Sequence, residues 1–440
     1  MNVRPCRTPS LLVGIALACA FAPAPAAAAD APSGAAWDGA LHLDDALHLA
    51  HADNWDLLAA RSQVTLAEAG ERIAREHPDP SLLLTTSHVH AEGGDATGLG
   101  NDLWSRAYDS VAQLGQELEI GGRRRDREQS ARSVATAARA RLADQRRLLD
   151  AAVVRAYVGA ALADANARIA GESAGYLRDE ARIATVRLEA GDISRSDRDQ
   201  IEIAAAEREL EAGNARADAT AQTVALETML GLTAGRGGVT LADSLETLAE
   251  RAAPGASPGP GGARPDLAAA RADLARAESD LRLQRALRIP DPTIVVQAEH
   301  QPPDRANTLG AGLSFPLPFW NRNAGEIDAA RAARDQAARD VHRIAAQVAA
   351  DTASARVRYE EAWQRWRRYR DDLRPRSEEI RRTVTLAYER GGASLLDLLE
   401  AQRSDNDVRL ETMRAASDAA IAAADLEAAT TAFEPESVTP

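Results

Sequence analysis

The sequence predicts a mainly α-helical protein with a small β part, and three observations lead to this fold class. Ala, Arg, Glu, Asp and Leu dominate the 440 residues, and aromatic residues make up only 4%, a composition typical of long helices and coiled coils. Two long stretches are almost free of glycine and proline. One succession of helical stretches and short strand-like runs occurs twice, and such internal repeats indicate the architecture of a chain.

The charge balance and the cysteines argue against several functions. The chain carries 66 acidic and 52 basic residues, for a formal net charge of −14, and the basic residues are all arginine because no lysine occurs. A nucleic-acid partner would normally require a basic domain, so none is expected. Cys6 and Cys19 are the only cysteines, so the chain beyond them has no disulfide, no thiol nucleophile and no cysteine metal ligand.

Residues 1–29 resemble a cleaved signal peptide. Arg4 and Arg7 precede an apolar core at residues 11–21, and an alanine run ends before Asp30, as in secretory signals. The alternative is a lipoprotein signal cleaved before Cys19, although the leucine two residues earlier is bulky for such a site. The remaining chain contains no apolar run of about 18 residues, so no membrane-spanning helix is expected.

A two-fold repeat organises the chain. The motif Pro-Asp-Pro occurs at residues 78–80 and again at 290–292, each time after a helical stretch and before a short apolar run. A Gly/Pro-rich linker separates the two copies. The predicted organisation is a signal peptide (1–29), a first repeat (30–252), the linker (253–262), a second repeat (263–434) and a short tail (435–440).

Each repeat is expected to begin with a helical stretch, at about residues 43–76 and 265–288, which the prolines end. A strand pair follows in each repeat, at residues 82–90 with 111–120, and at residues 293–299 with 308–315. In the last of these strands Leu309, Ala311 and Leu313 share one face. Such alternation is typical of an outer-membrane strand, and a half-buried soluble hairpin would look the same.

Long helices are expected after each strand pair. Residues 326–390 contain no glycine and only one proline, Pro375, where a kink is expected, and a helix of this length spans about 100 Å. Glycine ends a helix readily, and serine followed by aspartate three residues later forms a capping box at the start of the next helix. Helical turns are therefore predicted at Gly191, Ser194 and Asp197, and at Gly391, Gly392, Ser394 and Asp397.

Two segments resemble a known family. Residues 314–327 read Ser-Phe-Pro-Leu-Pro-Phe-Trp-Asn-Arg-Asn-Ala-Gly-Glu-Ile, and residues 388–397 read Tyr-Glu-Arg-Gly-Gly-Ala-Ser-Leu-Leu-Asp. With the two-fold repeat, they make the chain resemble the TolC-like outer-membrane efflux proteins over about residues 41–433. The first segment is most similar to the CzcC-like branch of that family, which exports heavy-metal cations.

The resemblance implies an architecture that composition does not show. Three chains would contribute four strands each to one transmembrane β-barrel, and their long helices would continue as an α-barrel across the periplasm. The protein would be a homotrimer in the lipid of the outer membrane. Its partners would be a periplasmic adaptor (membrane fusion) protein and an inner-membrane RND-type pump. No cofactor is implied.

By the same resemblance, Asp397 and Glu400 match acidic positions that ring the closed periplasmic mouth of the channel. Three copies would form a negative constriction that favours cations. In the simpler interpretation, Asp397 caps its helix beside Ser394 and Glu400 is a solvated surface residue. The two interpretations can coexist, and Asp197 in the first repeat has the same ambiguity.

Further roles follow from the resemblance. The helical turns at Gly191, Ser194 and Asp197 and at Gly391, Gly392 and Ser394 would dock the adaptor. Tyr388 and Arg390 would lock the closed mouth through hydrogen bonds to a neighbouring helix, or would be a packed aromatic ring and a solvated charge. Phe319 and Trp320 would lie at the membrane interface, or would simply pack.

No metal site and no catalytic residue are expected. His88 and His90 could share a strand face, but no third metal ligand accompanies them. The arginines at 123–125 would meet lipid headgroups or carboxylates, or would form a solvated helix face. The chain has no glycine-rich phosphate loop and no paired nucleophile and base, so an enzyme is not expected.

The predicted function is therefore the exit duct of a tripartite efflux pump that exports heavy-metal cations from the periplasm or the cytoplasm. One alternative is the outlet of a multidrug efflux or type I secretion system. A periplasmic coiled-coil adaptor is the alternative from another class. An adaptor would carry one helical hairpin flanked by small β-domains, whereas this sequence predicts two hairpins and two strand pairs.

Overall fold

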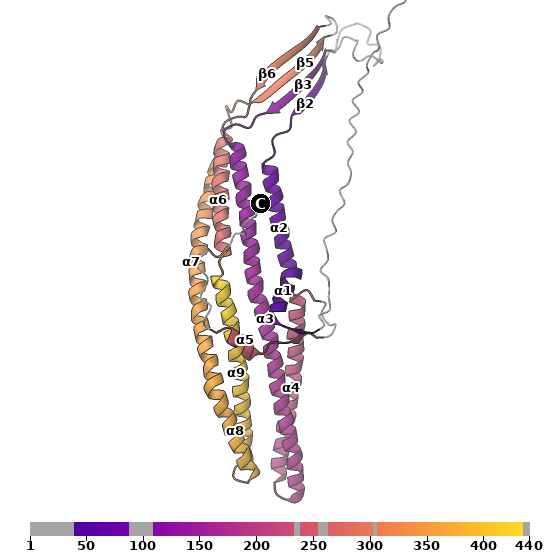
Figure 1. Ribbon diagram of the computed structural model, residues 1–440, viewed down its shortest axis with the longest axis vertical. Coiled ribbons are helices and arrows are strands. Elements are labelled where there is room, and N and C mark those ends of the chain that lie inside the picture. Colours follow the sequence, from indigo (N-terminus) through magenta and orange to yellow (C-terminus); the bar gives the residue numbers. More distant parts are fainter. Residues whose placement is uncertain (1–38, 88–108, 233–237, 254–262, 302–305, 434–440) are drawn as a thin grey trace, which may run out of the picture. The chain divides into compact units, whose positions relative to one another are not determined.

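Helices make up most of the chain in the computed structural model, which describes residues 39–87, 109–232, 238–253, 263–301 and 306–433 (Figure 1). In chain order the elements are β1 (Ala40–Leu41), α1 (Leu43–Asp53), α2 (Trp55–Ala74), β2 (Ser81–Ser87), β3 (Asp109–Glu117), α3 (Arg123–Ala190), α4 (Arg195–Met229), β4 (Thr240–Leu241), α5 (Leu245–Arg251), α6 (Pro265–Ala286), β5 (Thr293–Gln301), β6 (Ala306–Ser314), α7 (Ala324–Arg368), η1 (Tyr369–Leu373), α8 (Arg374–Glu389) and α9 (Leu395–Thr430). Within these ranges, no helix has an apolar stretch that is long enough to cross a membrane.

The expected strands and long helices are present, with one correction near the start. The single helical stretch expected at residues 43–76 is two helices, because Asn54 interrupts it. The backbone of Asn54 is extended, and its side-chain oxygen accepts hydrogen bonds from the N–H groups of Asp56 and Leu57 at 3.1 Å each. Asparagine caps a helix well, so α2 begins here as a new helix.

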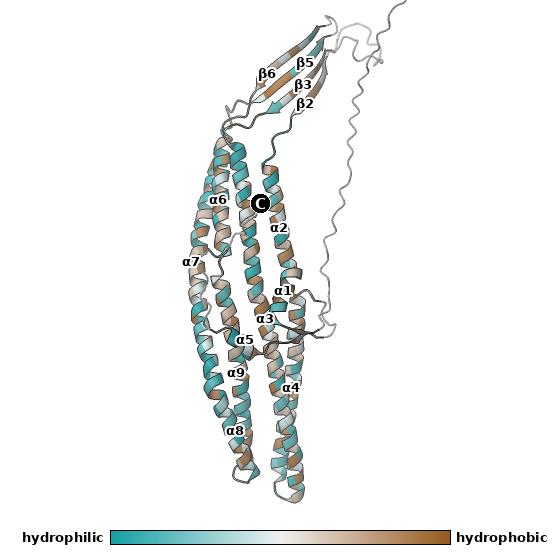
Figure 2. Ribbon diagram, in the orientation of Figure 1, coloured by the Kyte–Doolittle hydropathy of each residue, from teal (hydrophilic) through white to brown (hydrophobic). Residues whose placement is uncertain are grey.

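The four long strands form one antiparallel sheet in the order β2-β3-β5-β6. Its register places apolar residues opposite one another: Leu82 faces Leu114, which faces Val296, which faces Ala311. A second row contains Leu84, Ala112, Ala298 and Leu309. Because alternate residues share a face, these rows form one apolar face, whose leucines remain exposed (Figure 2).

Alanine dominates the buried core of the helical part and allows the helices to approach closely. The core joins α1, α3, α5, α7 and α9 and includes the end of α4. Its largest fully buried side chains include Tyr157 in α3 and Trp366 in α7. Trp366 packs against Trp363, with ring centroids 4.9 Å apart, and the guanidinium of Arg370 lies 4.5 Å from the Trp366 ring centroid.

A buried polar group, missed by sequence reasoning, joins the start of α1 to the short parallel pair β1 and β4. The Tyr157 hydroxyl donates to the Leu41 carbonyl at 2.6 Å and to Asp243 Oδ2 at 3.2 Å. Asp243 also accepts the N–H of Leu43 at 2.8 Å. Although burial favours the neutral carboxyl, the Leu43 N–H, the His42 ring and the Tyr157 hydroxyl lower the pKa of Asp243.

Burial, with the nearby charge of Asp243, raises the pKa of Tyr157 from 10.0 to about 12. The unfolded chain ionises this tyrosine first, so the stabilisation is complete below pH 10 and is lost as the pH rises to about 12. We expect the ionisation of Tyr157 to lower the free energy of unfolding by ~2–3 kcal/mol over this range. Tyr157→Phe should remove that contribution, as measured by urea unfolding at successive pH values. Parallel pH curves for the variant and the parent would contradict the prediction.

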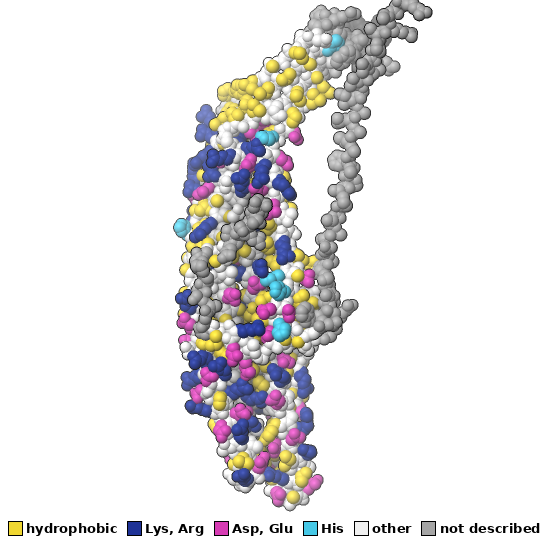
Figure 3. All heavy atoms as spheres, in the orientation of Figure 1, with side chains coloured by type: hydrophobic (Ala, Val, Ile, Leu, Met, Phe, Trp, Pro, Cys, Tyr) yellow, Lys and Arg dark blue, Asp and Glu magenta, His cyan; other side chains and the backbone are white. Residues whose placement is uncertain are grey.

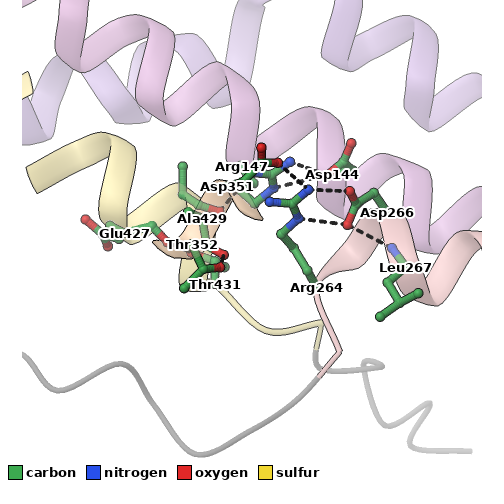
Figure 4. A network of polar contacts seen from close by, with 11 residues as sticks. Asp144, Arg147, Arg264, Asp266, Leu267, Asp351, Thr352, Glu427, Ala429 and Thr431 are labelled. Atoms are coloured by element: carbon green, nitrogen blue, oxygen red, sulfur yellow. Dashed lines mark hydrogen bonds and ion pairs between the residues drawn. The ribbon is translucent and has the colours of Figure 1, made fainter. Parts of the chain in front are cut away.

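A second polar network holds four helices together at the start of the second repeat (Figure 4). Arg264, which is 8% exposed, donates to both carboxylate oxygens of Asp266 at 2.9 and 2.7 Å and to Asp351 in α7 at 3.1 Å. Beside it, Arg147 in α3 donates to the Ala428 carbonyl of α9 at 2.8 Å. The planar guanidinium groups thus fix the entry of α6 against α3, α7 and α9.

The sequence predicts a kink at Pro375, and the structure has a π-helical turn just before this residue. α7 passes into the π-helical segment η1, and Pro375 then lies in the first turn of α8. Proline cannot donate a helical hydrogen bond to the carbonyl four residues earlier. A π-turn changes the local hydrogen-bonding pattern without ending the helix, so the chain continues to the second helical turn.

Candidate functional site

The first helical turn joins α3 to α4, and glycine and serine shape it. Gly191 adopts a left-handed φ of 83°, and the following N–H, of Asp192, donates to the Arg187 carbonyl at 2.9 Å. Ser194 then begins α4. Its hydroxyl accepts the N–H of Asp197 at 3.1 Å, while the Asp197 carboxylate accepts the N–H of Ser194 at 3.2 Å. This reciprocal pair is the capping box expected from the sequence.

The second turn, between α8 and α9, repeats this construction. Gly391 has a φ of 74°, and the N–H of Gly392 donates to the Ala387 carbonyl at 2.8 Å. Ser394 Oγ accepts the N–H of Asp397 at 3.2 Å, and Asp397 Oδ2 accepts the N–H of Ser394 at 2.9 Å. The two turns therefore share one local geometry, although their adaptor-docking role stays a prediction.

Asp397 caps its helix and is also exposed. Its hydrogen bonds with the Ser394 hydroxyl and N–H lower the pKa of Asp397, so the carboxylate stays charged at neutral pH. Glu400, one helical turn further on, is exposed as well. The corresponding residue of the first turn is the neutral Gln200, so this pair of carboxylates belongs to the second turn alone.

Further acidic residues continue along α9, which sequence reasoning did not recognise. Glu400, Asp407 and Glu411 border a surface hollow of about 420 Å³ together with Arg403 and Tyr369. Their spacing of seven and four residues places them on one helix face. This spacing could have indicated the acidic face from the sequence. Charged residues on a long helix usually form an ordinary solvated face, however, so the spacing alone did not distinguish it.

The two helical hairpins contact each other near their turns. The guanidinium of Arg187, at the end of α3, lies 5.3 Å from the ring centroid of Tyr388, at the end of α8. Arg390 is exposed and has no ion pair within the described part of the chain. Tyr388 is thus packed within its own chain, and the locking role of Tyr388 and Arg390 stays a prediction.

A buried polar contact between α8 and α9 lies above the second turn. Asp405 accepts a hydrogen bond from Ser377 at 2.9 Å and forms an ion pair with Arg381 at 3.0 Å. The side chain of Asp405 is only 7% exposed. Asp405 lies on the same buried stripe of α9 as Leu398 and Ala401. Because buried polar groups are hydrogen-bonded, a carboxylate at this position of the sequence indicated that a polar partner lies close to it.

The aromatic pair and the arginines next to the sheet occupy different environments. Phe319 is 66% exposed and Trp320 is 94% exposed, and their rings meet edge to face at 6.0 Å. Both rings are thus mostly exposed in the single chain, and their place at the membrane interface stays a prediction. Arg123 pairs with the buried Asp291, and Arg124 contacts His77 and Glu128. The third of these consecutive arginines, Arg125, has no hydrogen bond or ion pair with a described residue.

Among the residues that the structure describes, no three His, Cys, Asp or Glu side chains are grouped to hold a metal ion. His88 and His90 lie outside the described residues, as do the predicted signal peptide and nearly all of the linker. The geometry therefore offers an apolar sheet face, two capped helical turns and an exposed acidic helix face.

Comparison with known proteins places this arrangement in a family. The model of the family described as outer membrane efflux protein matches residues 46–232 and 262–432, more than half of the chain. The cobalt-zinc-cadmium resistance protein CzcC of Cupriavidus metallidurans is 26% identical over 377 residues, which are 83% of this chain and 84% of the relative.

Solved structures show the same fold. The structure of CusC, described in connection with folding and transmembrane channel formation, superposes with a TM-score of 0.72 at 16% identity, over 89% of this chain and 92% of the other. The outer membrane protein VceC of Vibrio cholerae gives 0.68 at 20% identity, over 89% and 97%. The adaptor alternative is thereby excluded, and the chain belongs to the outer membrane efflux protein family, whose members are channels and not enzymes.

Proposed function

We propose that this chain is the outer-membrane exit duct of a tripartite pump that exports divalent heavy-metal cations. The likeness to CzcC over more than four fifths of both chains carries the metal assignment. The exposed Asp397 and Glu400 agree with a cationic cargo, because rings of carboxylates favour cations in channels. The exported metal is the cargo and needs no resident binding site.

The proposed assembly is a homotrimer. In a single chain the outer edges of β2 and β6 have no partner among the described strands, and unpaired edges are unfavourable in lipid. Three sheets joined edge to edge would close a barrel with the leucine-rich face toward the bilayer. Nine-residue strands such as β5 and β6 have the length that spans a membrane when tilted.

The helical end would meet the other components of the pump. The two capped turns, at Gly191 and Gly391, would dock a periplasmic adaptor that joins the duct to an inner-membrane RND-type pump. Tyr388 and Arg390, near the second turn, would hold the mouth closed. Phe319 and Trp320 would mark the opposite boundary, where the duct enters the outer membrane.

Deletion of the gene tests the proposed cargo. We expect the deletion strain to lose growth on zinc, cobalt or cadmium salts while its growth on dyes and antibiotics stays unchanged, because the pump would have no exit for those metals. Growth inhibition is measured across a panel that also contains nickel, copper and silver. Restoration by the plasmid-borne gene is the control.

Sensitivity to dyes and antibiotics instead of metals would assign the chain to the alternative, a multidrug outlet with the same fold. Unchanged metal and drug resistance with a defect in protein export would assign it to type I secretion.

A further inference from the structure

Four exposed arginines lie beside the sheet and have no carboxylate partner within the described residues. Arg125 lies in the first turn of α3, Arg285 lies in the last turn of α6, Arg288 follows that helix, and Arg322 lies just before α7. We call Arg125, Arg285, Arg288 and Arg322 the arginine cluster. All four belong to the three connections that enter or leave strands β3, β5 and β6.

Other arginines in the same connections already have partners, which sets the arginine cluster apart. Arg123 forms an ion pair with the buried Asp291, Arg127 pairs with Glu119, and Arg282 pairs with Asp126 at 3.1 Å. The Arg123 guanidinium also donates to the Ile289 carbonyl. The carboxylates that could have neutralised the arginine cluster are therefore mostly engaged in holding the junction between the helices and the sheet together.

Two further acidic residues lie in these connections, Glu117 and Glu326, and each has another environment that favours its charge. Glu117 shares the polar face of the sheet, because it alternates with Gln116 and lies two residues from Gly115. Glu326 lies in the first turn of α7, where the helix N-terminus favours a negative charge. None of the four guanidinium groups forms an ion pair with either carboxylate within the described residues.

Exposed apolar side chains accompany the arginine cluster. Leu287, Ile289, Phe315, Leu317, Phe319 and Trp320 are between 41% and 94% exposed. Figure 3 shows arginine side chains gathered at the helix ends directly next to the hydrophobic face of the sheet. An apolar face, then aromatic rings, then free cations is the order in which a bilayer presents hydrocarbon, interface and headgroup phosphate.

We propose that the arginine cluster binds the phosphate groups of anionic phospholipids in the leaflet that surrounds this end of the sheet. The proposal rests on the proposed function, because it requires the apolar face to lie in the outer membrane. Arg285 lies in the last turn of α6 and Arg288 in the turn that follows it, so both cations stand at the entry to β5. Guanidinium groups bind phosphate through two parallel N–H···O bonds.

The arrangement favours a lipid over a protein partner. A docked acidic protein would need a mainly polar and charged surface around the arginines, whereas the exposed residues of these connections include six large apolar side chains. Fluid anionic lipids meet both requirements, because their phosphates reach the arginines while their chains cover the apolar residues. The attraction should weaken with salt, as it does for basic residues at anionic bilayer surfaces.

Fluorescence quenching by brominated lipids tests the proposal with the full protein reconstituted into vesicles. The probes are brominated phosphatidylglycerol and brominated phosphatidylcholine at equal mole fraction, and Trp320→Phe subtracts the contribution of the other tryptophans. We expect phosphatidylglycerol to be preferred at the Trp320 site by about fivefold or more, the effect of one arginine at an anionic surface. The variant R125Q/R285Q/R288Q/R322Q should lose the preference, and high salt should reduce it in the parent.

The matched control is R216Q/R271Q/R356Q/R368Q, which removes four other exposed arginines, in α4, α6 and α7, that form no ion pair within the described part of the chain. It should keep the preference for phosphatidylglycerol. Equal quenching by both lipids in the parent, or equal loss in both variants, would overturn the proposal. Ion conductance across pure phosphatidylcholine membranes tests the proposed channel function separately from lipid binding. A protein that conducts ions there but shows no lipid preference would overturn the lipid proposal and leave the channel function standing.

Discussion

Replacing Asp397 and Glu400 with their amides, D397N/E400Q, is expected to lower the cation-to-anion permeability ratio of the channel about tenfold, because clustered charges create local potentials of several kT. The side-chain oxygen that D397N leaves in place can still accept the hydrogen bond from the Ser394 N–H, so the capping geometry is retained. E400Q also introduces the residue type that the first turn has at the corresponding position, Gln200. The ratio is measured from reversal potentials in planar bilayers with a salt gradient.

The first helical turn supplies the control for this prediction. E189Q/D192N removes two exposed carboxylates beside Gly191 and so produces the same change in net charge. Selectivity should remain near that of the parent protein. If D397N/E400Q and E189Q/D192N shift the reversal potential equally, the carboxylates of the second turn do not line the narrowest part of the channel, and capping is the sufficient account of Asp397.

Trp366→Ala is expected to give the largest loss of stability among single substitutions in the helical core. Trp366 is fully buried, packs on Trp363 and lies under the Arg370 guanidinium. Replacing a buried tryptophan with alanine removes its apolar contacts and leaves a cavity, at a cost of ~3–5 kcal/mol. Urea unfolding, followed by the helical circular dichroism signal in detergent, measures the difference.

Trp320→Ala is the matched control, because the same residue type is 94% exposed there. Its unfolding midpoint in detergent should stay close to that of the parent. Trp366→Phe should recover most of the loss, since the indole N–H of Trp366 has no hydrogen-bond partner in the described part of the chain and phenylalanine removes that cost. A loss below about 1 kcal/mol for Trp366→Ala would mean that the core refills the cavity.

Local chemistry explains why the two helical turns could be predicted residue by residue. Glycine at 191 and 391 permits a left-handed backbone, and serine with aspartate three positions later satisfies the free N–H groups at the start of a helix. These requirements involve neighbours in the sequence. The same holds for the alternation of Leu309, Ala311 and Leu313, which the observed register confirms as one face of the sheet.

Long-range polar contacts could not be predicted in this way. Asp243 is more than eighty residues from Tyr157 in the sequence, and nothing near either residue identifies the other as its partner. The short pair β1 and β4 depends on the same meeting of distant segments. The break at Asn54 was accessible in principle, because asparagine favours N-caps, but the surrounding helix-forming residues favoured one continuous helix.

The pairing of β3 with β5 has a consequence for the symmetry and ancestry of the channel. This seam joins the second strand of the first repeat to the first strand of the second repeat, antiparallel. In the proposed trimer, β6 would meet β2 of the next chain in the same manner, again second strand to first. Seams within and between chains would therefore alternate around a pseudo-sixfold ring. A half-length ancestor with one strand pair could have closed that ring as a hexamer, and gene duplication would then have linked the copies in pairs without any new kind of contact.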